Sequence, residues 1–384
     1  MTDGDLATPT LIGAVGPLGP TDAAGCEVTR IDTTASPEVA ASASTLLRDH
    51  TTLRVGGPAR RYVVARTEAE LVEAVLEADR SGEPVLVLGG GSNLLVSDAG
   101  FAGTVVQVAT RGVQADVSGC GGALVRLEAG EVWDDVVALA VEREWIGIEA
   151  LSGVPGLVGA TPIQNVGAYG TDVSQTIASV RTLDRTTGQF RTFAASDCGF
   201  GYRWSRFKAE PGRYVVLQVS FQFSLGNLSA PIRYAELAQR LGVEPGDRAD
   251  TRAVREAVLD IRRGKGMVLD TGDHDTWSAG SFFTNPVLTP EQAGGLPDDA
   301  PRYPASGGTV KTSAAWLIDH AGFHRGFAVG RARVSTKHTL ALTNPGDATA
   351  DDIVALAREI RAGVRERFGV LLAPEPVLVG VGLG

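Results

Sequence analysis

Hydrophobic and polar positions along this chain follow two periods, one typical of strands and one typical of helices. The apolar run 62–66 predicts a strand, and Thr67-Glu-Ala-Glu70 after it matches the capping box that starts a helix. Apolar residues then recur at helical spacing as far as Gly82, and the run 84–88 predicts a second, buried strand. This order is that of a β-α-β unit.

The alternation continues along the rest of the chain, without an internal repeat. Short apolar segments predict strands, and longer amphipathic segments predict helices, one of which has Gly264 as its C-cap. The expected strands are 104–108, 123–129, 180–184, 189–193, 214–221 and 377–381, and the expected helices are 132–143, 251–263, 314–319 and 350–368. A shift towards Gly, Asp and Thr after Asp270 indicates a domain boundary. Residues 1–46 show no periodicity and predict a mostly disordered tail.

Composition narrows the classes of protein to which the chain can belong. Its net charge is −10 and its positive charges form no stripe, which argues against nucleic-acid binding. No apolar run reaches the length of a membrane-spanning helix. Cys26, Cys120 and Cys198 form no CxxC pair, and the histidines lack metal-binding spacing. The sequence therefore indicates neither a disulfide framework nor a metal site, and a reducing cytoplasm is expected.

The segment Gly153–Gly170 contains several glycines and two prolines but no charged residue. A solvent-exposed loop usually carries charge, so this run indicates backbone packed against something flat or bulky, such as a cofactor. The turn Gly89-Gly-Gly-Ser-Asn-Leu94 follows a strand, but Leu94 replaces the third glycine of the dinucleotide-binding motif. Its N–H groups still suit a pyrophosphate, and the alternative is an ordinary turn after a strand.

Two basic groups are candidates for binding an anion. Arg203 in the sequence FGYR can pair with a carboxylate, or it can make a cation–π contact on a surface strand. Arg262, Arg263 and Lys265 end an expected helix. They can bind a diphosphate there, or they can simply interact favourably with the helix C-terminus.

A hydroxyl and a carboxyl group are candidates for acid–base chemistry. Ser281 lies at a glycine-bounded turn before two aromatic residues, where it can donate a proton or serve as an ordinary turn residue. No GxSxG motif surrounds it, which argues against a nucleophilic serine. Glu375 lies between two prolines, where it can act as an acid or base or protect a strand edge.

Together these segments resemble the UDP-N-acetylenolpyruvoylglucosamine reductase (MurB) family, from about His50 to Gly380. Seven motifs in the family's order carry the resemblance: GGGSNLL, SGVPGLVGATPIQNVGAYG, FGYR, RRGKG, GSFFTNP, AAWLIDHAG and APEP. The resemblance implies an α+β fold of the vanillyl-alcohol-oxidase (PCMH) type, in which two α+β subdomains bind FAD non-covalently and a separate α+β domain binds the substrate. The implied boundaries are 47–110 and 111–266 for the two FAD-binding subdomains, 267–370 for the substrate-binding domain, and 371–384 for a C-terminal strand that returns to the FAD-binding region.

The activity implied by the resemblance is an NADPH-dependent step of peptidoglycan synthesis. In the family, hydride passes from NADPH to FAD and then to C3 of UDP-N-acetylglucosamine enolpyruvate, and protonation of C2 gives UDP-N-acetylmuramate. By resemblance, Arg203 and Glu375 stabilise the enolate-like charge that develops, and Ser281 delivers the proton to C2.

Binding residues also follow from the resemblance. Tyr202, Lys265 and Asn285 are expected to contact the substrate, and Tyr234 matches the tyrosine that closes over it in one of the two family types. His320 stands where the family often has glutamine; both side chains can donate a hydrogen bond, but only histidine titrates near neutral pH. The expected FAD contacts are Gly89, Gly90, Gly91, Ser92, Asn93, Leu94, Gly153, Pro155, Gly156, Gly159, Gln164, Asn165, Gly167, Ala168 and Tyr169.

Two alternatives remain open at this point. One is an FAD-dependent sugar or alcohol oxidase of the same fold, although no histidine lies between His50 and His274 for the covalent flavin attachment common in such enzymes. The other is a non-catalytic flavin or nucleotide-sugar sensor, against which the presence of Arg203, Ser281 and Glu375 together argues. The chain is expected to act on a UDP-sugar as a monomer, without a nucleic-acid or membrane partner.

Overall fold

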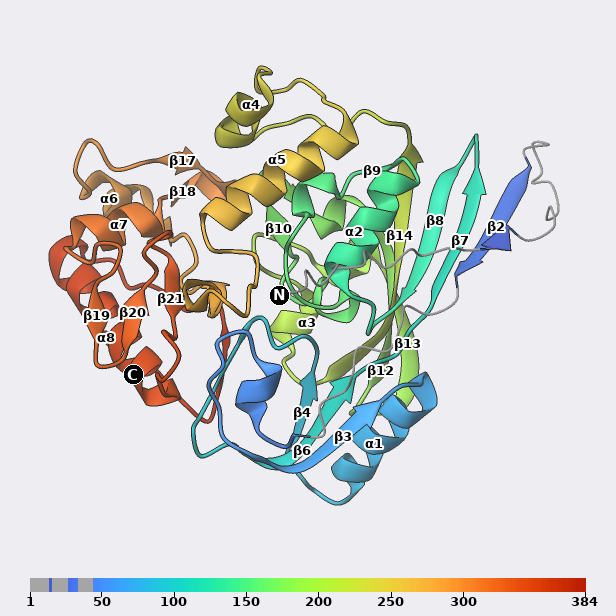
Figure 1. The fold of residues 1–384 in the computed structure, drawn as a ribbon, viewed down its shortest axis with the longest axis horizontal. Coiled ribbons are helices and arrows are strands. Elements are labelled where there is room, and N and C mark those ends of the chain that lie inside the picture. Colours follow the sequence, from blue (N-terminus) through green and yellow to red (C-terminus); the bar gives the residue numbers. More distant parts are fainter. Residues whose placement is uncertain (1–13, 16–26, 34–43) are drawn as a thin grey trace, which may run out of the picture. The chain divides into compact units, whose positions relative to one another are not determined.

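The computed structural model describes residues 14–15, 27–33 and 44–384, which form two compact units (Figure 1). Unit 1 contains the described residues before 43 together with 62–89 and 105–260. Unit 2 contains residues 44–61, 90–104 and 261–384. Each unit is therefore assembled from segments that are far apart in the sequence, and the range 47–110 is divided between them.

Unit 1 is built on a large sheet whose strands pair antiparallel in the order β1-β2-β7-β8-β14-β12-β13, with β9 also paired to β14. The strands are β1 (Ala14–Val15), β2 (Val28–Thr33), β7 (Val113–Ser118), β8 (Gly122–Glu128), β9 (Trp145–Ile146), β12 (Ile177–Asp184), β13 (Gln189–Ala194) and β14 (Tyr214–Leu225). Unit 1 also contains α2 (Trp133–Glu142), the hairpin β10 (Gly167–Ala168) and β11 (Thr171–Asp172), α3 (Arg206–Ala209) and α4 (Ala235–Leu241).

Two hydrophobic clusters cover opposite faces of β14. Val216, Val219 and Phe221 pack with Trp133 of α2, whereas Leu217 packs in the second cluster. Neighbouring residues of a strand point to opposite faces, so a strand buried on both sides must be apolar at consecutive positions. This requirement explains the run Tyr-Val-Val-Leu at the start of β14.

A three-stranded sheet of order β3-β6-β4 contributes to the second cluster. Its strands are β3 (Ala59–Ala65), β4 (Val85–Leu88) and β6 (Phe101–Val108), and α1 (Glu68–Arg80) connects β3 to β4. The capping box predicted at Thr67 and Glu70 is present, and Leu71 and Val75 of α1 are fully buried. The β-α-β pattern is thus confirmed, with β6 inserted between its two strands.

Part of the predicted tail differs from expectation. The strand β2 pairs with β7, and Arg30 of β2 donates to Asp116 of β7 at 3.2 Å. The side chain of Ile31 packs against the core of unit 1. The expected disorder is therefore wrong for Val28–Thr33, because the edge of β7 supplies backbone partners that composition does not reveal. Residues 1–13, 16–26 and 34–43 lie outside the described residues.

The expectation about cysteines is also wrong in one respect. Cys120, in the turn between β7 and β8, is disulfide-bonded. Cysteine spacing identifies local motifs only, whereas a disulfide can join any two residues that the fold brings within reach. Cys198 is free and buried, and burial raises the pKa of its thiol to about 11.

Unit 2 packs two helices against a four-stranded sheet of order β15-β21-β20-β19. These strands are β15 (Ser278–Ser281), β19 (Ala328–Val329), β20 (Ala332–Val334) and β21 (Ala341–Thr343), and the helices are α7 (Ala314–His320) and α8 (Ala350–Phe368). Smaller elements are β16 (Val287–Leu288), β17 (Tyr303–Pro304), β18 (Val310–Lys311), α6 (Pro290–Gly294), and the parallel pair β5 (Leu94–Val96) and β22 (Val377–Val379). The helix α5 (Thr251–Gly264) begins in unit 1 and ends in unit 2.

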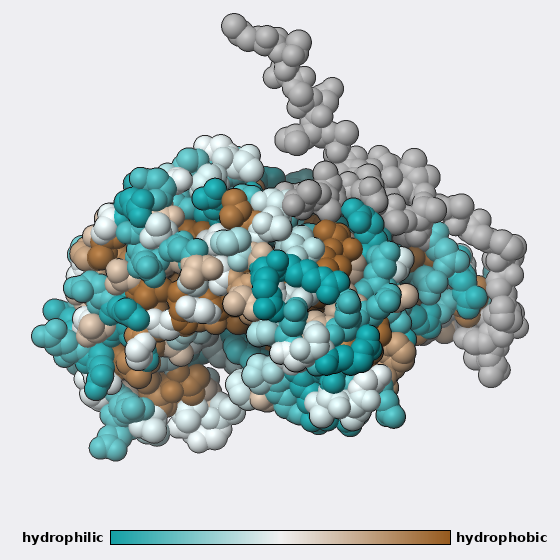
Figure 2. All heavy atoms as spheres, turned by 90° about the horizontal axis from the view of Figure 1, so that it is seen from below, coloured by the Kyte–Doolittle hydropathy of each residue, from teal (hydrophilic) through white to brown (hydrophobic). Residues whose placement is uncertain are grey.

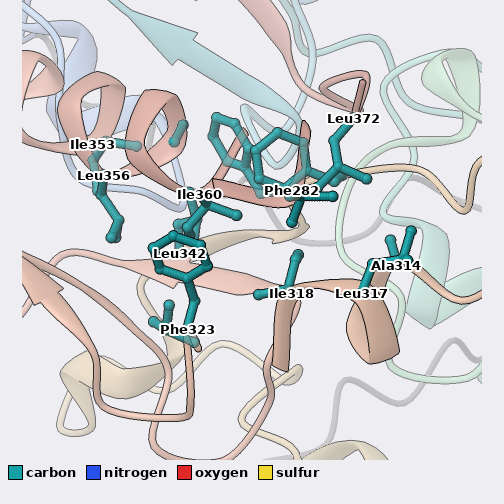
Figure 3. Close-up of a cluster of buried hydrophobic side chains, with 14 of the residues drawn as sticks. Phe282, Ala314, Leu317, Ile318, Phe323, Leu342, Ile353, Leu356, Ile360 and Leu372 are labelled. Carbon is teal, nitrogen blue, oxygen red and sulfur yellow. The ribbon is translucent and has the colours of Figure 1, made fainter. Parts of the chain in front are cut away.

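The long helix α8 has the bounds that the sequence predicts. Thr349 and Asp352 form a capping box at its start, and the carboxylate of Asp98 accepts the N–H groups of Ala350 at 3.0 Å and Asp351 at 3.2 Å. The buried residues of α8 recur at helical spacing and meet Phe282 and Leu342 in the core (Figure 3). They are Ala350, Ile353, Val354, Leu356, Ala357, Ile360 and Val364.

On the face shown in Figure 2, hydrophobic residues lie in small groups among hydrophilic ones. Within the described part of the chain, none of the helices has the length and apolar character needed to cross a bilayer.

Replacing Ile360 by alanine should lower the free energy of unfolding by about 2–5 kcal/mol, because its buried side chain leaves a cavity in the core of unit 2. Urea unfolding followed by circular dichroism would measure the loss. The neighbouring Glu359 is exposed, and Glu359→Ala should change the stability by no more than about 0.5 kcal/mol. Equal effects of the two substitutions would contradict the packing described.

Candidate active site

The glycine-rich turn between β4 and β5 is closely packed on one side. Gly91 has φ +61°, and a Cβ atom there would lie 1.9 Å from the carbonyl oxygen of His50. Its own carbonyl accepts the N–H of Thr52 at 3.2 Å. Only glycine fits this position, whereas the neighbouring Gly90 is exposed and has no side chain to cover its backbone. The turn therefore presents bare backbone followed by a serine hydroxyl, as a pyrophosphate site requires.

The uncharged segment 153–170 lies in unit 1 and is held by its backbone. Residues 129–134, which lead into α2, form hydrogen bonds with the first half of the segment 153–170. These hydrogen bonds run from Gly153 N to the Asp134 carboxylate (2.6 Å), Trp133 N to Gly156 O (3.1 Å), Val158 N to Glu131 O (2.9 Å) and Gly159 N to Ala129 O (2.8 Å). A Cβ on Gly159 would lie 2.6 Å from the Cβ of Ala129, so this close approach also requires glycine.

The opposite side of the same segment is open and uncharged. Pro155, Ala160, Ile163 and Gly170 are exposed. Apolar side chains and bare backbone in one exposed loop suit contact with a flat ring system. Considered separately, this loop in unit 1 and the turn at Gly91 in unit 2 have the chemical character expected of a ring contact and of a pyrophosphate contact, respectively.

Arg203 is bonded to this segment. Its guanidinium donates from Nη2 to the carbonyl of Gly167 at 2.6 Å and from Nη1 to that of Asn165 at 3.4 Å. The residue lies in a tight turn with φ +51° rather than on the surface strand considered above, and its guanidinium carbon is 5.9 Å from the centre of the Tyr202 ring. Asn165 is buried and donates in return to the carbonyl of Gly201 at 3.1 Å. These hydrogen bonds therefore hold the FGYR turn against the uncharged segment.

Tyr234 lies immediately before α4, with its side chain partly exposed. Its ring meets the ring of Tyr169 edge to face, with 5.3 Å between centroids. The structure thus joins a tyrosine expected to close over substrate to the uncharged segment, within unit 1.

Ser281 and Glu375 are brought together in unit 2 by backbone pairing. The residue after Ser281 is Phe282, whose carbonyl accepts the N–H of Glu375 at 2.8 Å. Asn93 also joins this arrangement, because its side-chain amide donates to the Glu375 carbonyl at 3.3 Å and its own carbonyl accepts the N–H of Val377 at 2.9 Å. The glycine-rich turn, the GSFF strand and the APEP segment are therefore neighbours.

Three further predicted substrate contacts also lie in unit 2. Lys265 follows α5, which ends at Gly264 as predicted, and the next residue, Gly266, has the left-handed conformation (φ +63°). The Asn285 side chain accepts the N–H of Ala314 at 2.9 Å, which fixes its amide at the start of α7.

His320, the last residue of α7, stacks on Trp316 with 3.8 Å between ring centroids. Its Nδ1 lies 2.9 Å from the Trp316 carbonyl, and its Nε2 lies 3.9 Å from the Asp299 carboxylate.

Two buried glutamates beside the uncharged segment were not predicted. Glu131 accepts the N–H of Gly112 at 2.6 Å and lies 3.5 Å from Arg111, and burial raises the pKa of its carboxyl. Glu149 accepts two backbone N–H groups and is also buried. A signal for Glu149 was present, because it is the only charged residue between Glu144 and Asp172.

Comparison with known proteins agrees with this geometry. Residues 59–194 match the family model described as "FAD binding domain". A solved UDP-N-acetylenolpyruvylglucosamine reductase from Thermus caldophilus covers 92% of this chain and 99% of its own, with a TM-score of 0.59 at 24% identity, and so shows the same fold. The matched FAD-binding domain and the shared fold define an FAD-dependent oxidoreductase with a PCMH-type FAD-binding fold.

The particular family follows from closer relatives. Residues 272–379 match the model described as "UDP-N-acetylenolpyruvoylglucosamine reductase, C-terminal domain". Reductases of that name are 63% identical over 333 residues in Cutibacterium acnes (86% of this chain, 88% of the relative) and 57% identical over 344 residues in Streptomyces coelicolor (87% and 88%). The chain belongs to the UDP-N-acetylenolpyruvoylglucosamine reductase family.

The packing of the glycine-rich turn can be tested by Gly91→Ala, which should abolish or strongly reduce FAD binding because the new methyl group would clash with the His50 carbonyl. The measurement is the flavin absorbance of the purified protein relative to its concentration. Gly82→Ala is the matched control, since Gly82 has φ +69° but no atom within 4 Å of the added Cβ. Full flavin content in Gly91→Ala would contradict the assignment.

Proposed function

We propose that this chain catalyses the NADPH-dependent reduction of UDP-N-acetylglucosamine enolpyruvate to UDP-N-acetylmuramate, with FAD as the hydride carrier. Family membership supports the reaction, and it disfavours the oxidase and sensor alternatives. The observation that carries the proposal is the pairing of the GSFF and APEP segments, in which the N–H of Glu375 donates to Phe282 at 2.8 Å. This pairing holds a hydroxyl and a carboxyl group at neighbouring positions, as protonation at an enolic carbon requires.

FAD bound to this protein would, once reduced by NADPH, supply the hydride that adds to C3 of the enol ether. Addition at C3 places negative charge on C2 and on the adjacent carboxylate of the substrate. We assign the stabilisation of this charge to Arg203 and Glu375, because a group that stabilises charge as it develops must already be oriented. The two carbonyl contacts of Arg203 restrict the guanidinium before the substrate arrives.

We assign the proton transfer to C2 to Ser281. A serine hydroxyl is a weak acid at neutral pH, so it serves only when it is held in line with a strongly basic carbon. The strand β15 provides this fixation, since Ser281 pairs with Ala341 and the next residue donates its N–H to Leu340 at 2.7 Å.

The remaining side chains are assigned to substrate binding. Lys265 would contact the diphosphate, Asn285 the nucleotide, and Tyr202 the pocket near the reacting carbons. His320 would be a further substrate contact, and Tyr234 would close over the bound substrate. We assign FAD binding to the residues of the turn 89–94 and the segment 153–170. We further propose that the enzyme acts as a monomer in the cytoplasm, where NADPH and nucleotide sugars are available.

The absorption spectrum tests the reaction directly. Purified protein should show the absorbance of oxidised flavin, lose it on anaerobic addition of NADPH, and regain it on addition of the enolpyruvyl substrate. Protein that binds no FAD, or that is reoxidised only by oxygen, would contradict the proposal.

Ser281→Ala should leave the rate of flavin reduction by NADPH close to that of the wild type and slow reoxidation by substrate by roughly 10²- to 10⁴-fold, the usual contribution of a positioned proton donor. Stopped-flow absorbance measures the two half-reactions separately. Ser278→Ala is the control in the same strand, because its hydroxyl accepts the N–H of Gly280 and has no assigned chemical role. Equal slowing of both half-reactions by Ser281→Ala would rule out proton delivery as the role of Ser281.

A further inference from the structure

The carboxylate of Glu149 joins two segments of unit 1 that are far apart in the sequence. One oxygen accepts the N–H of Gly147 and the other accepts the N–H of Ala230, both at 2.7 Å. The residue is only 3% exposed, so both hydrogen bonds are shielded from water. A buried carboxylate that accepts two N–H groups at this distance forms strong, charge-assisted bonds.

From Ala230 the connection leads to Tyr234. Antiparallel backbone contacts hold this part of the chain against residues 246–250: Ser229 N donates to Ala249 O at 2.8 Å, and Ile232 N donates to Asp247 O at 2.8 Å. Tyr234 follows within two residues of Ile232 and precedes α4, which is labelled in Figure 1.

The other end of the connection is the uncharged segment. The main-chain carbonyl of Glu149 accepts the Ser152 hydroxyl at 2.7 Å, and residue 153 begins the segment assigned to the flavin. Tyr169, in the same segment, meets the ring of Tyr234. Glu149 therefore bonds to the base of both chain segments whose tyrosine rings touch.

We propose that Glu149 is a positioning residue that holds Tyr234 in place for substrate closure, acting through the N–H of Ala230. This inference rests on the closing role assigned to Tyr234 above. It assigns to Glu149 a role in substrate binding rather than in the reduction of the flavin by NADPH, because Tyr234 closes over the UDP-sugar.

The proposal predicts which property of Glu149 matters. A carboxylate has two acceptor oxygens, whereas the amide of glutamine has one oxygen and one NH₂ group. Glu149→Gln keeps the size of the side chain but must point a donor at the N–H of either Gly147 or Ala230. In either orientation one of the two hydrogen bonds is lost, so the link between residues 147–149 and Ala230 is weakened and Tyr234 is held less firmly.

Glu149→Gln should raise the KM for the enolpyruvyl substrate roughly tenfold, because the lost hydrogen bond is expected to contribute about a factor of ten to substrate affinity. The rate of flavin reduction by NADPH should stay within about twofold of the wild type. Both are measured by stopped-flow and steady-state assays on full-length protein with bound FAD. Equal slowing of the two half-reactions would overturn the proposal.

A double-mutant cycle with Tyr234→Ala separates positioning from general loosening of the fold. If Glu149 acts through Tyr234, the Glu149→Gln effect on KM should largely disappear in the Tyr234→Ala background. Additive effects would overturn the proposal. Ser152→Ala, which removes the contact to the main-chain carbonyl of Glu149 but leaves the carboxylate intact, should keep the wild-type KM, and a rise equal to that of Glu149→Gln would also overturn it.

Ala230→Pro removes the same hydrogen bond from the donor side and serves if Glu149→Gln does not fold. It should reproduce the rise in KM, and a wild-type KM in a folded Ala230→Pro protein would overturn the proposal. These results are distinct from a failure of the proposed function. In that case the wild-type protein itself would not oxidise NADPH in the presence of the enolpyruvyl substrate.

Discussion

A loop that faces a flavin without charged side chains of its own has to be held in place by its backbone. In this protein the segment 153–170 meets that constraint through contacts from outside it. Backbone groups and a carboxylate at the start of α2 bond to its first half, and the guanidinium of Arg203 donates to two carbonyls in its second half. Glycine is required where these contacts are closest, as at Gly159. The loop is therefore held without charged side chains of its own, and the arginine that holds it is the one proposed to act on the substrate.

Unit 2 solves a related problem by strand pairing. Its proposed acid–base groups, Ser281 and Glu375, lie far apart in the sequence. One backbone hydrogen bond of 2.8 Å, from the N–H of Glu375 to the carbonyl of Phe282, aligns their segments. Asn93 adds the glycine-rich turn to the same pairing through the carbonyl of Glu375. The positions of Ser281 and Glu375 thus depend on regular backbone contacts between segments whose neighbouring residues, Phe282 among them, are buried in the core of unit 2.

Much of this arrangement could be predicted from the sequence, for identifiable reasons. Both ends of the helix α8 are marked in the sequence, by the capping box at Thr349 and by Gly369. Its buried residues also recur at helical spacing. The uncharged segment was recognisable because glycine and the absence of charge report on contact with a bulky ligand. The family resemblance rests on seven motifs that occur along the chain in the family's order.

The rest depended on contacts between distant residues. The strand β2 is stabilised by the edge of β7, so nothing in its own Thr-rich sequence distinguishes it from the residues around it. The end of α5 at Gly264 was predicted, but only the backbone conformation shows that the left-handed glycine after the helix is Gly266. The buried carboxylate of Glu149 accepts N–H groups from Gly147 and Ala230. The sequence shows that a glutamate is present here, but it does not show which backbone groups bond to it.

The parallel pairing of β5 with β22 has a consequence for how the protein is made. β5 is synthesised long before β22, its partner, and long-range pairing of this kind forms slowly. During translation the edge of β5 therefore stays unpaired until β22 is synthesised. All strands of the large sheet of unit 1 precede β22 in the sequence, so that sheet can form first. Vectorial synthesis thus gives the two units different folding histories: the large sheet of unit 1 can form before β22 is synthesised, whereas the β5–β22 pair of unit 2 cannot.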